Sequence, residues 1–599
     1  MGLIKGHRRR AAFAAAVPLM LLAAGLTWLA PAAGIVVAPG EPVDGLRGFA
    51  TGMTAHVGAV NTGELSLADA EVAWSGASMD ADADGLAGTQ VSEVNRQWQD
   101  DRGGKISFAR GAGLELGVGT APIDPAQLQL TGLAEADAPP PSTANEEIEV
   151  PLDPLAYASV AEGNAVANSN ESGLVPDVCV LGDDISRGRA HAADVDLLDL
   201  GGNTNENGLD SPLVSLDDVD NVEGDQRSVS QSQSREKLVP VGGNQFGLMS
   251  EVTMTMAPVT VQQDLGPTDP LRLLTIEVLG EWTLRAVATG GDGSFVELIE
   301  PGNAVVRILD ADGLELLGID LSDILGDLGL DLPDELEPLI QVSVGQPPRA
   351  IADPGTLPDE DSAPTETPNK AEGAIDIVRV RLLDAILPGG VADIRVGHME
   401  VSAEVPDGGI NCPIPVTKTA DPDEIFVGAG ATNTSHIELT VHNVFDCDLN
   451  NVTLTDRINR TEGDADFRLL NDEPEADSPD IPDDGLLVTD GSEVVVWSLG
   501  SIPKGTTKAV SIDLEAVEGG GILEDIAEAA GEFANCVGED ASGLAIAGLD
   551  LTGLSIPVEV RIELPRTGAD ALRTVGIGGG LALASSAAGL LLRRRRRAA

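Results

Sequence analysis

The chain has 599 residues and a formal net charge of −61, with 36 lysines and arginines against 97 aspartates and glutamates. Such an acidic chain repels phosphate backbones, so we expect no nucleic-acid partner. Aromatic residues make up only 3% of the chain and hydrophobic residues 42%, so we expect an aliphatic core in a folded protein of two or more domains.

The first residues have the pattern of an export signal. Lys5 and the arginines Arg8 to Arg10 form a positive segment, which the apolar stretch Ala11 to Leu29 follows. Ala30-Pro31-Ala32 then supplies small side chains at a cleavage point. We therefore expect residues 1–32 to be a secretory signal peptide, with an uncleaved signal anchor as the alternative.

Between residues 33 and 411, short stretches of alternating or β-branched residues recur, separated by Gly, Asp, Asn and Pro. This pattern predicts β-strands. The clearest stretches are Met249–Val261, Leu274–Ala288, Ile375–Leu383 and Ala392–Ala403. We expect residues 33–411 to form a β-rich, surface-exposed region with long loops, as one domain or more.

Four segments of this region depart from the strand pattern. Leucines and isoleucines recur at helical spacing after Asp320, a capping residue, so one short helix is expected in Asp320–Leu339. Three further segments are rich in proline or polar residues and are expected to be surface loops. They are Glu135–Glu147, Gly201–Glu236 and Gln346–Gly373.

From residue 412 to 560 the strand pattern sharpens. Alternating segments are separated by turn residues, which predicts an immunoglobulin-like β-sandwich. The segments are His436–Asn443, Asn451–Asp456, Val494–Gly500, Ala509–Ala516 and Glu528–Val537. The region resembles the conserved-repeat β-sandwich domain of bacterial surface proteins, whose own function is undefined. The motifs that carry the resemblance are Thr417-Lys418-Thr419, Thr455-Asp456, Trp497-Ser498-Leu499-Gly500 and Pro503-Lys504-Gly505.

Four cysteines, Cys179, Cys412, Cys447 and Cys536, bear on the redox state of the chain. Disulfides are favoured in an exported protein, and four cysteines allow three pairings that sequence cannot decide. We prefer Cys447–Cys536, within the C-terminal domain, and Cys179–Cys412, within the region before it. A zinc site is disfavoured, because no Cys-x-x-Cys pair occurs.

An intramolecular Lys–Asn isopeptide bond, as found in some surface modules, is a further hypothesis for the sandwich. Lys418, Asn535 and Asp456 each share strand parity with apolar neighbours, so all three would point inward. Asp456 would supply the buried carboxylate that the reaction needs, and Glu438 fits that role less well. The alternative is an ordinary lysine at a strand end.

Other chemistry finds little support. Asp80-x-Asp82-x-Asp84-Gly85 matches the first half of a calcium loop, but Val91 stands where a bidentate glutamate is required. We expect no dedicated metal site and no cofactor, with weak Ca²⁺ binding by acidic loops as an open alternative. Common nucleophile, phosphate-loop and zinc-protease motifs are absent from the sequence, so we expect no enzymatic activity and no catalytic residues.

The tail of the chain combines three signals. Leu564-Pro565-Arg566-Thr567-Gly568 precedes the apolar run Val575–Leu592, which five arginines follow. Eighteen helical residues span roughly 27 Å, enough to cross a bilayer core, and the arginines would stay on the cytoplasmic side. This order resembles the cell-wall sorting signal of Gram-positive surface proteins. We expect a motif segment at 561–568 and a membrane-spanning sorting tail at 569–599.

The resemblance implies that a sortase cuts after Thr567 and joins its carbonyl to the peptidoglycan precursor. The whole chain also resembles actinobacterial surface proteins whose C-terminal anchors vary between members. We therefore expect a wall-anchored surface protein for adhesion or surface structure, with sortase, peptidoglycan and an unidentified surface or host ligand as partners. A secreted wall- or carbohydrate-acting enzyme and a pilus-associated subunit are the alternatives.

Overall fold

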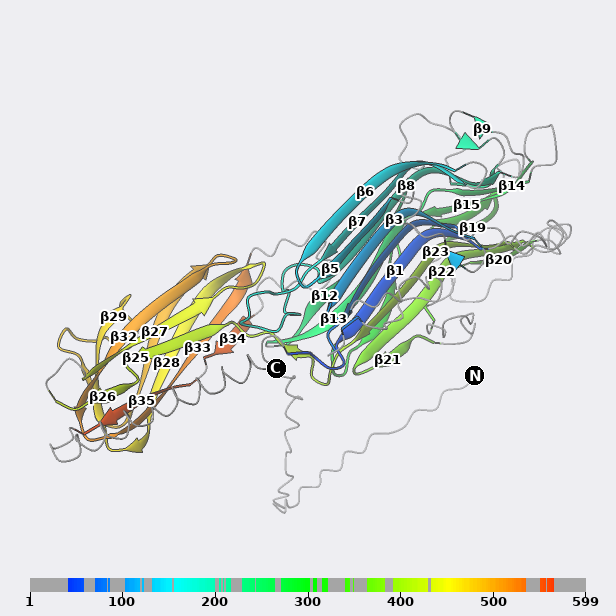
Figure 1. The fold of residues 1–599 in the computed structure, drawn as a ribbon. Coiled ribbons are helices and arrows are strands. Elements are labelled where there is room, and N and C mark those ends of the chain that lie inside the picture. The colour runs from blue at the N-terminus through cyan, green and yellow to red at the C-terminus, as the bar shows by residue number, and fades with distance from the viewer. Residues whose placement is uncertain are drawn as a thin grey trace, which may run out of the picture.

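The computed structural model describes residues 41 to 564 with gaps, the longer ones at 59–69, 87–102, 123–131, 217–228, 264–270, 321–339, 350–362, 383–391 and 535–549. The described residues form strands and no helix, so the fold is all-β. Figure 1 shows a larger part, containing β1 to β24, and a smaller part, containing β25 to β35, placed end to end. No membrane-spanning helix is found among the residues described.

The larger part consists of two antiparallel sheets packed face to face. The first sheet has nine strands and the order β20-β22-β23-β1-β2-β3-β4, with β21 and β5 paired beside this path. Its strands are β1 (Arg47–Gly58), β2 (Ala70–Asp80), β3 (Ser107–Val118), β4 (Ala121–Pro122), β5 (Leu133–Ala138), β20 (Ile340–Val344), β21 (Thr365–Thr367), β22 (Lys370–Leu382) and β23 (Ala392–Glu404).

The second sheet has thirteen strands and the order β17-β16-β13-β12-β8-β11-β14-β15-β18-β19, with β24, β6 and β7 paired beside this path. A separate pair is formed by β9 (Thr204–Asn205) and β10 (Gly208–Leu209). The thirteen strands are β6 (Ser142–Leu152), β7 (Ala156–Ala167), β8 (Ser186–Asp199), β11 (Pro212–Leu216), β12 (Val229–Gly242), β13 (Gln245–Thr255), β14 (Val259–Gln263), β15 (Leu271–Leu279), β16 (Trp282–Ala288), β17 (Phe295–Ile299), β18 (Val305–Leu309), β19 (Glu315–Asp320) and β24 (Ile410–Asn411).

Glycine allows the two large sheets to approach very closely where β3 crosses β7 and β8. A Cβ atom at Gly111 would lie 2.0 Å from the Arg189 carbonyl oxygen, and one at Gly163 would lie 2.1 Å from the Gly111 carbonyl oxygen. Backbone therefore packs on backbone at this crossing, where sheets are otherwise held about 10 Å apart by their side chains. At this crossing a larger residue would overlap the opposing backbone, so glycine is required there.

A buried polar layer also joins the two sheets. Ser75 Oγ on β2 lies 2.6 Å from Ser232 Oγ and 2.8 Å from Ser234 Oγ on β12. Ser250 Oγ on β13 lies 2.6 Å from the Ser402 carbonyl oxygen on β23 of the other sheet and 2.6 Å from Glu236 on β12, and burial raises the pKa of the Glu236 carboxyl well above its usual range. Buried hydroxyls need partners, so these pairs fix how the sheets face each other.

The smaller part is a two-sheet sandwich. One sheet has the order β25-β27-β32-β29-β30 and the other the order β26-β35-β33-β28-β31, with β34 paired to β33. Its strands are β25 (Val416–Asp421), β26 (Glu424–Phe426), β27 (Thr434–His442), β28 (Asp448–Gly463), β29 (Asp466–Glu473), β30 (Leu486–Val488), β31 (Ser492–Ile502), β32 (Thr507–Glu518), β33 (Gly521–Ala534), β34 (Asp550–Leu554) and β35 (Val558–Glu563). Trp497, Phe467 and Phe533 are fully buried between these sheets.

All three segments expected to be loops contain strands, and Gln346–Gly373 holds β21 and the first residues of β22. Glu135–Glu147 holds the end of β5 and the start of β6, with the three prolines only at the turn between them. Gly201–Glu236 includes the first half of β12, where Ser232 and Ser234 point inward. The expected helix lies outside the described residues, except that Asp320 is the last residue of β19.

Candidate functional site

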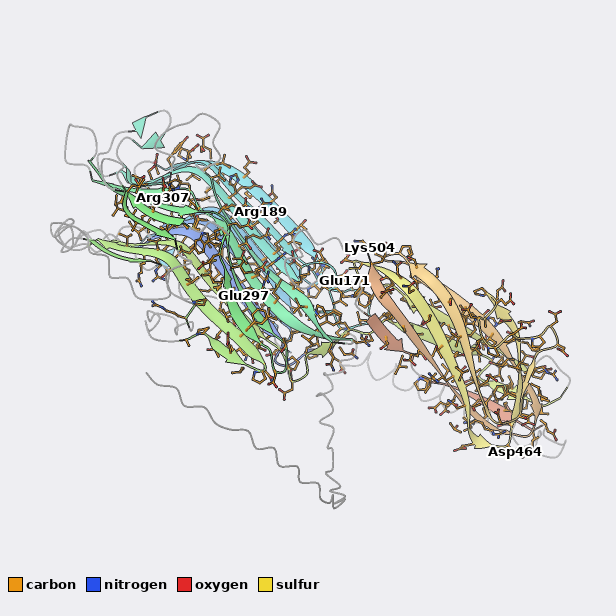
Figure 2. The ribbon with its side chains drawn as sticks, turned by 180° about the vertical axis from the view of Figure 1, so that it is seen from behind. Glu171, Arg189, Glu297, Arg307, Asp464 and Lys504 are labelled. Atoms are coloured by element: carbon orange, nitrogen blue, oxygen red, sulfur yellow. A yellow bond between two sulfur atoms is a disulfide. The ribbon has the colours of Figure 1, made fainter. Side chains whose placement is uncertain are left out.

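The chain leaves the sandwich at the end that lies far from the larger part. β35 ends at Glu563, and Leu564 follows it with 60% of its surface exposed. A Cβ atom at Gly520 would lie 3.6 Å from Leu564 Cγ, and Gly520 accepts a backbone hydrogen bond from Asp464. Figure 2 shows Asp464 at the far tip of the sandwich, whereas Lys504 and Glu171 lie at the junction.

Leu564 is the only residue of the predicted sorting motif that the structure describes. Pro565, Arg566, Thr567 and Gly568 lie outside the described residues, as do the signal peptide and the apolar tail. Leu564 comes directly after the last strand, at the tip of the molecule, and its apolar side chain is exposed to solvent.

The opposite end of the sandwich is joined to the larger part by several links. Cys179 and Cys412, both fully buried, form a disulfide with Cα atoms 5.7 Å apart. Asn244 donates through Nδ2 to the Thr552 carbonyl oxygen at 2.6 Å, and the Thr552 amide donates to Asn244 Oδ1 at 2.7 Å. Cys447 is also disulfide-bonded, and Cys536 lies outside the described residues.

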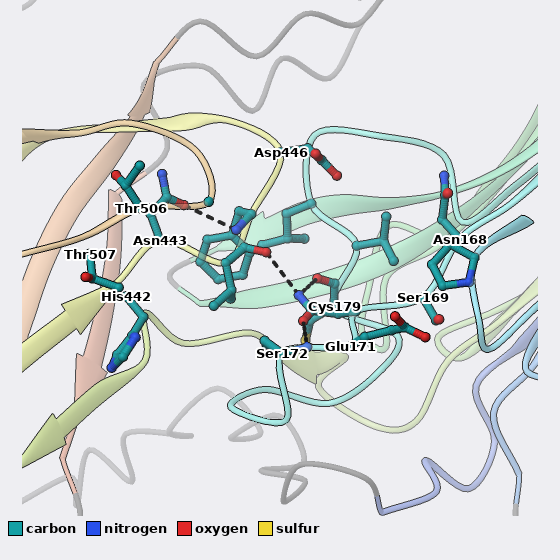
Figure 3. A pocket seen from close by; sticks show the side chains of 17 residues that line it. Asn168, Ser169, Glu171, Ser172, Cys179, His442, Asn443, Asp446, Thr506 and Thr507 are labelled. Carbon is teal, nitrogen blue, oxygen red and sulfur yellow. Dashed lines mark hydrogen bonds between the residues drawn. The ribbon is translucent and has the colours of Figure 1, made fainter.

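A cavity of about 460 Å³ lies at this junction. Figure 3 shows its two walls, a loop of the larger part with Asn168 and Glu171 and turns of the sandwich with His442 and Thr506. Asn170 crosses between the walls, because its side-chain amide donates to the Val444 carbonyl oxygen at 3.3 Å. Polar and apolar side chains both line the cavity.

The sandwich core contains a lysine held between two aspartates. Lys418 Nζ, from the edge strand β25, contacts Asp456 Oδ1 on β28 and Asp525 Oδ1 on β33. The exposure of the three side chains is 0%, 0% and 1%. The lysine belongs to one sheet and both carboxyls belong to the other, so the contact crosses the core of the sandwich.

The electrostatics of this cluster are unusual for a protein interior. Burial, together with the neighbouring Asp456 carboxyl, raises the pKa of Asp525 well above its usual range, although Lys418 opposes the shift. Asp456 Oδ2 and Asp525 Oδ2 accept no hydrogen bond within the described part of the chain. Two buried carboxyls that share one lysine are costly, so this cluster is a candidate for chemistry as well as for structure.

The alternation of side chains along a strand predicts that Lys418 and Asp456 point inward, but the sequence analysis did not include Asp525. Lys418 and Asp456 point inward and meet, as predicted, while Glu438 is exposed. Asn535, the expected acceptor of an isopeptide bond, lies outside the described residues. Asp525 was missed because the last long strand was expected to begin at Glu528, whereas β33 begins at Gly521.

A second buried ionisable cluster lies on the nine-stranded sheet. His398 on β23 contacts Asp376 on β22 through Nδ1 at 2.6 Å and Glu400 through Nε2 at 3.0 Å, and its side chain is 3% exposed. Burial alone would lower the pKa of His398, but Asp376 and Glu400 raise it to about 9. Burial would likewise raise the pKa of Asp376, yet His398 holds it well below its usual range. The imidazolium is therefore a structural cation at neutral pH.

The His398 cluster should make stability fall in alkaline solution. Because the pKa of His398 is raised in the folded state from 6.5 to about 9, its stabilisation is complete below pH 6.5 and is lost as the pH rises through about 9. The shift corresponds to about 3 kcal/mol in the free energy of unfolding. His398→Gln should remove this slope in urea unfolding measured from pH 6 to 10, and His436→Gln, at an exposed histidine, should keep it. Equal slopes in the wild type and His398→Gln would contradict the assignment.

The acidic loop at residues 80–85 shows no metal-binding arrangement in its described part. Asp82 Oδ1 accepts a hydrogen bond from the Gly45 amide at 2.8 Å, and Asp80 Oδ1 accepts one from the Asp82 amide at 3.0 Å. Asp84 lies outside the described residues. Across the rest of the described chain, no group of three or more His, Cys, Asp or Glu side chains could hold a metal ion.

Comparison with known proteins does not assign a family. No known protein-family model matches the chain, and no curated protein matches it. Among solved structures, AvmM, which catalyses macrocyclization in alchivemycin A biosynthesis, is 13% identical over 26% of this chain and 93% of its own, with a TM-score of 0.17. Serine-rich repeat protein Srr2 from Streptococcus agalactiae is 11% identical over 54% of this chain and 92% of its own, with a TM-score of 0.09. Such low scores carry no argument about fold or function.

Proposed function

We propose that the chain is an exported surface protein, joined to peptidoglycan by a sortase through Thr567, that presents the larger β part for adhesion or surface structure. The observation that supports it most is the exit of the chain at the tip of the sandwich. The predicted sorting motif begins there, at exposed Leu564, while the larger part is fixed at the other end by the Cys179–Cys412 disulfide and the Asn244–Thr552 hydrogen bonds.

The finer parts of this proposal come from the sequence. The sandwich is an immunoglobulin-like module that acts as a wall-proximal spacer, and residues 575–592 form a membrane helix that holds the precursor until the sortase acts. The arginines Arg593 to Arg597 keep that helix from being pulled through. The acidic surface of the mature protein keeps it soluble and monodisperse outside the cell.

Replacement of Thr567 by alanine should abolish wall attachment, because the acyl group that the sortase transfers is the Thr567 carbonyl and the threonine is part of its motif. The protein should move from the muramidase-released wall fraction to the membrane and medium. Thr574→Ala, in the tail beyond the motif, should leave attachment unchanged. In the wild type, mass spectrometry should find a C-terminal peptide that ends at Thr567 and carries a wall fragment.

The same fractionation separates the alternatives. A ladder of covalent polymers in the wall extract would favour a pilus-associated subunit over a single displayed protein. A wild-type chain recovered intact from the cytosol, with residues 1–32 and 569–599 still present, would overturn export and attachment together.

A further inference from the structure

The cluster of Lys418, Asp456 and Asp525 contains one carboxyl more than an ion pair with a single lysine requires. One lysine balances one carboxylate, and the second buried carboxyl must be neutralised by a proton. The raised pKa of Asp525 agrees with that requirement. The cluster as a whole is then neutral, and one of its proton arrangements is an uncharged amine between two carboxylic acids. An uncharged amine is a nucleophile, and a carboxylic acid is an electrophile that it can attack.

We propose that Lys418 and Asp525 become joined by an intramolecular amide bond, with Asp456 as the group that moves the protons. The lysine side chain and both carboxyls are fully enclosed between the sheets, and Lys418 Nζ contacts both carboxyls directly. Folding therefore creates the high effective concentration that such a condensation requires. The inference concerns the sandwich itself and does not depend on attachment to the wall.

The reaction balances without any co-reactant. The uncharged Lys418 nitrogen attacks Asp525 Cγ and forms a tetrahedral centre. Protonated Asp456 delivers its proton to the departing hydroxyl group of Asp525, the C–O bond breaks, and the Asp456 carboxylate then accepts a proton from the nitrogen. One amide bond forms, one water molecule leaves, and Asp456 returns to its starting state, which is general acid–base catalysis by a buried carboxyl.

Strand geometry explains how the two carboxyls flank one amine. Asp456 lies opposite Ala527 and Asp525 lies opposite Ile458, so the two aspartates are diagonal neighbours on the inner face of one sheet. Lys418 reaches them from the first strand of the other sheet. We assign Asp525 as the acceptor because burial raises the pKa of its carboxyl and so favours the protonated form, whereas a carboxylate would repel the attacking nitrogen's lone pair.

The bond would join the two sheets covalently, so a pulling force on the sandwich would be carried by a shorter stretch of chain. Tension that enters near Cys412 would pass from β25 to β33 through the amide, so residues between Lys418 and Asp525 would not be stretched. Where the chain is attached through Thr567, as proposed above, such a link would protect the spacer from mechanical unfolding.

Peptide mapping of the disulfide-reduced, trypsin-digested full chain tests this directly. We expect one linked species that contains Lys418 and Asp525, lighter by one water than the sum of its two peptides, with no cleavage after Lys418. Recovery of the two peptides separately and unmodified would overturn the proposal. A link that maps to Asp456 instead would overturn the assignment of the acceptor. This measurement needs no variant, so it does not depend on how substitutions in the core affect folding.

Variants then test the roles of the individual residues. Lys418→Met should remove the link, while Lys504→Met should retain it, because Lys504 is an exposed lysine of the same sandwich that pairs with Asp446. Asp456→Asn should slow formation of the link by about a hundredfold or more after refolding. Link formation at the wild-type rate in Asp456→Asn would contradict the proton-transfer role.

Discussion

Replacing Gly111 by alanine is expected to destabilise the larger part severely, by about 3 kcal/mol or more, or to prevent its secretion. The added Cβ would lie 2.0 Å from the Arg189 carbonyl oxygen and 2.8 Å from the Asn164 carbonyl oxygen, both on the opposing sheet. These atoms belong to backbone that is fixed in β7 and β8, so no side chain can rotate away. The sheets would have to separate, and the neighbouring apolar contacts would be lost with them.

Gly291→Ala is the matched control for this prediction. Gly291 lies in the turn before β17, a Cβ atom there would meet nothing within 4 Å, and its backbone is not in the left-handed region. Its effect on the free energy of unfolding should stay within about 0.5 kcal/mol. Urea unfolding of the secreted chain, with secretion yield beside it, measures both variants. Similar midpoints for Gly111→Ala and the wild type would show that the sheets are not packed backbone to backbone at this position.

The all-β architecture could be predicted because most core strands alternate plainly between apolar and polar residues. Ile375–Leu383 and Ala392–Ala403 correspond closely to β22 and β23. The polar strand β12 could not be read in the same way, because serines and glutamines alternate in Ser230–Ser234 and composition alone indicates a loop. Buried Ser232 and Ser234 bond to the Ser75 hydroxyl of the opposing sheet, and Ser230 Oγ accepts a hydrogen bond from the Ala257 amide. That partnership exists only in the tertiary structure.

Two of the stretches predicted as single long strands are each divided into two strands. The stretch Met249–Val261 is divided into β13 and β14, and Leu274–Ala288 into β15 and β16. At each division the pairing changes, since β13 pairs with β12 whereas β14 pairs with β11. Apolar alternation continues through both divisions, so periodicity shows that strands are present but not that the sheet branches.

The buried cluster of the sandwich was partly accessible to sequence reasoning. Parity within a strand placed Lys418 and Asp456 inward, because each has apolar neighbours two residues away. Asp525 has the same signal, since Leu523, Ala527 and Ala529 are buried on its face of β33. Acidic residues surround it in the sequence, as in a solvated segment, so the pattern predicts a strand only from Glu528, whereas β33 begins at Gly521. The contact between Lys418 and Asp525 could not be predicted from the sequence, because it depends on the register in which β28 and β33 pair.

Removal of the Cys179–Cys412 disulfide is expected to have the second large effect, a loss of about 2–5 kcal/mol in the free energy of unfolding. The bond joins residues separated by 233 positions, and both cysteines are fully buried beside the junction. It also holds the loop whose Leu181 carbonyl oxygen accepts a hydrogen bond from the Asp446 amide at 3.0 Å. Without the bond, that loop should open first, and the sandwich should then move relative to the larger part.

The double variant Cys179→Ser/Cys412→Ser tests this without leaving a free thiol from the pair. We expect a lower urea midpoint, new proteolytic cleavage within residues 168–181, and a broader distribution of overall dimensions in small-angle scattering. Glu171→Gln, an exposed change in the same loop, should behave as the wild type. If the double variant resists proteolysis and keeps its dimensions, the junction is held by its hydrogen bonds alone. In that case the Asn244–Thr552 pair, and not the disulfide, fixes how the sandwich carries the larger part.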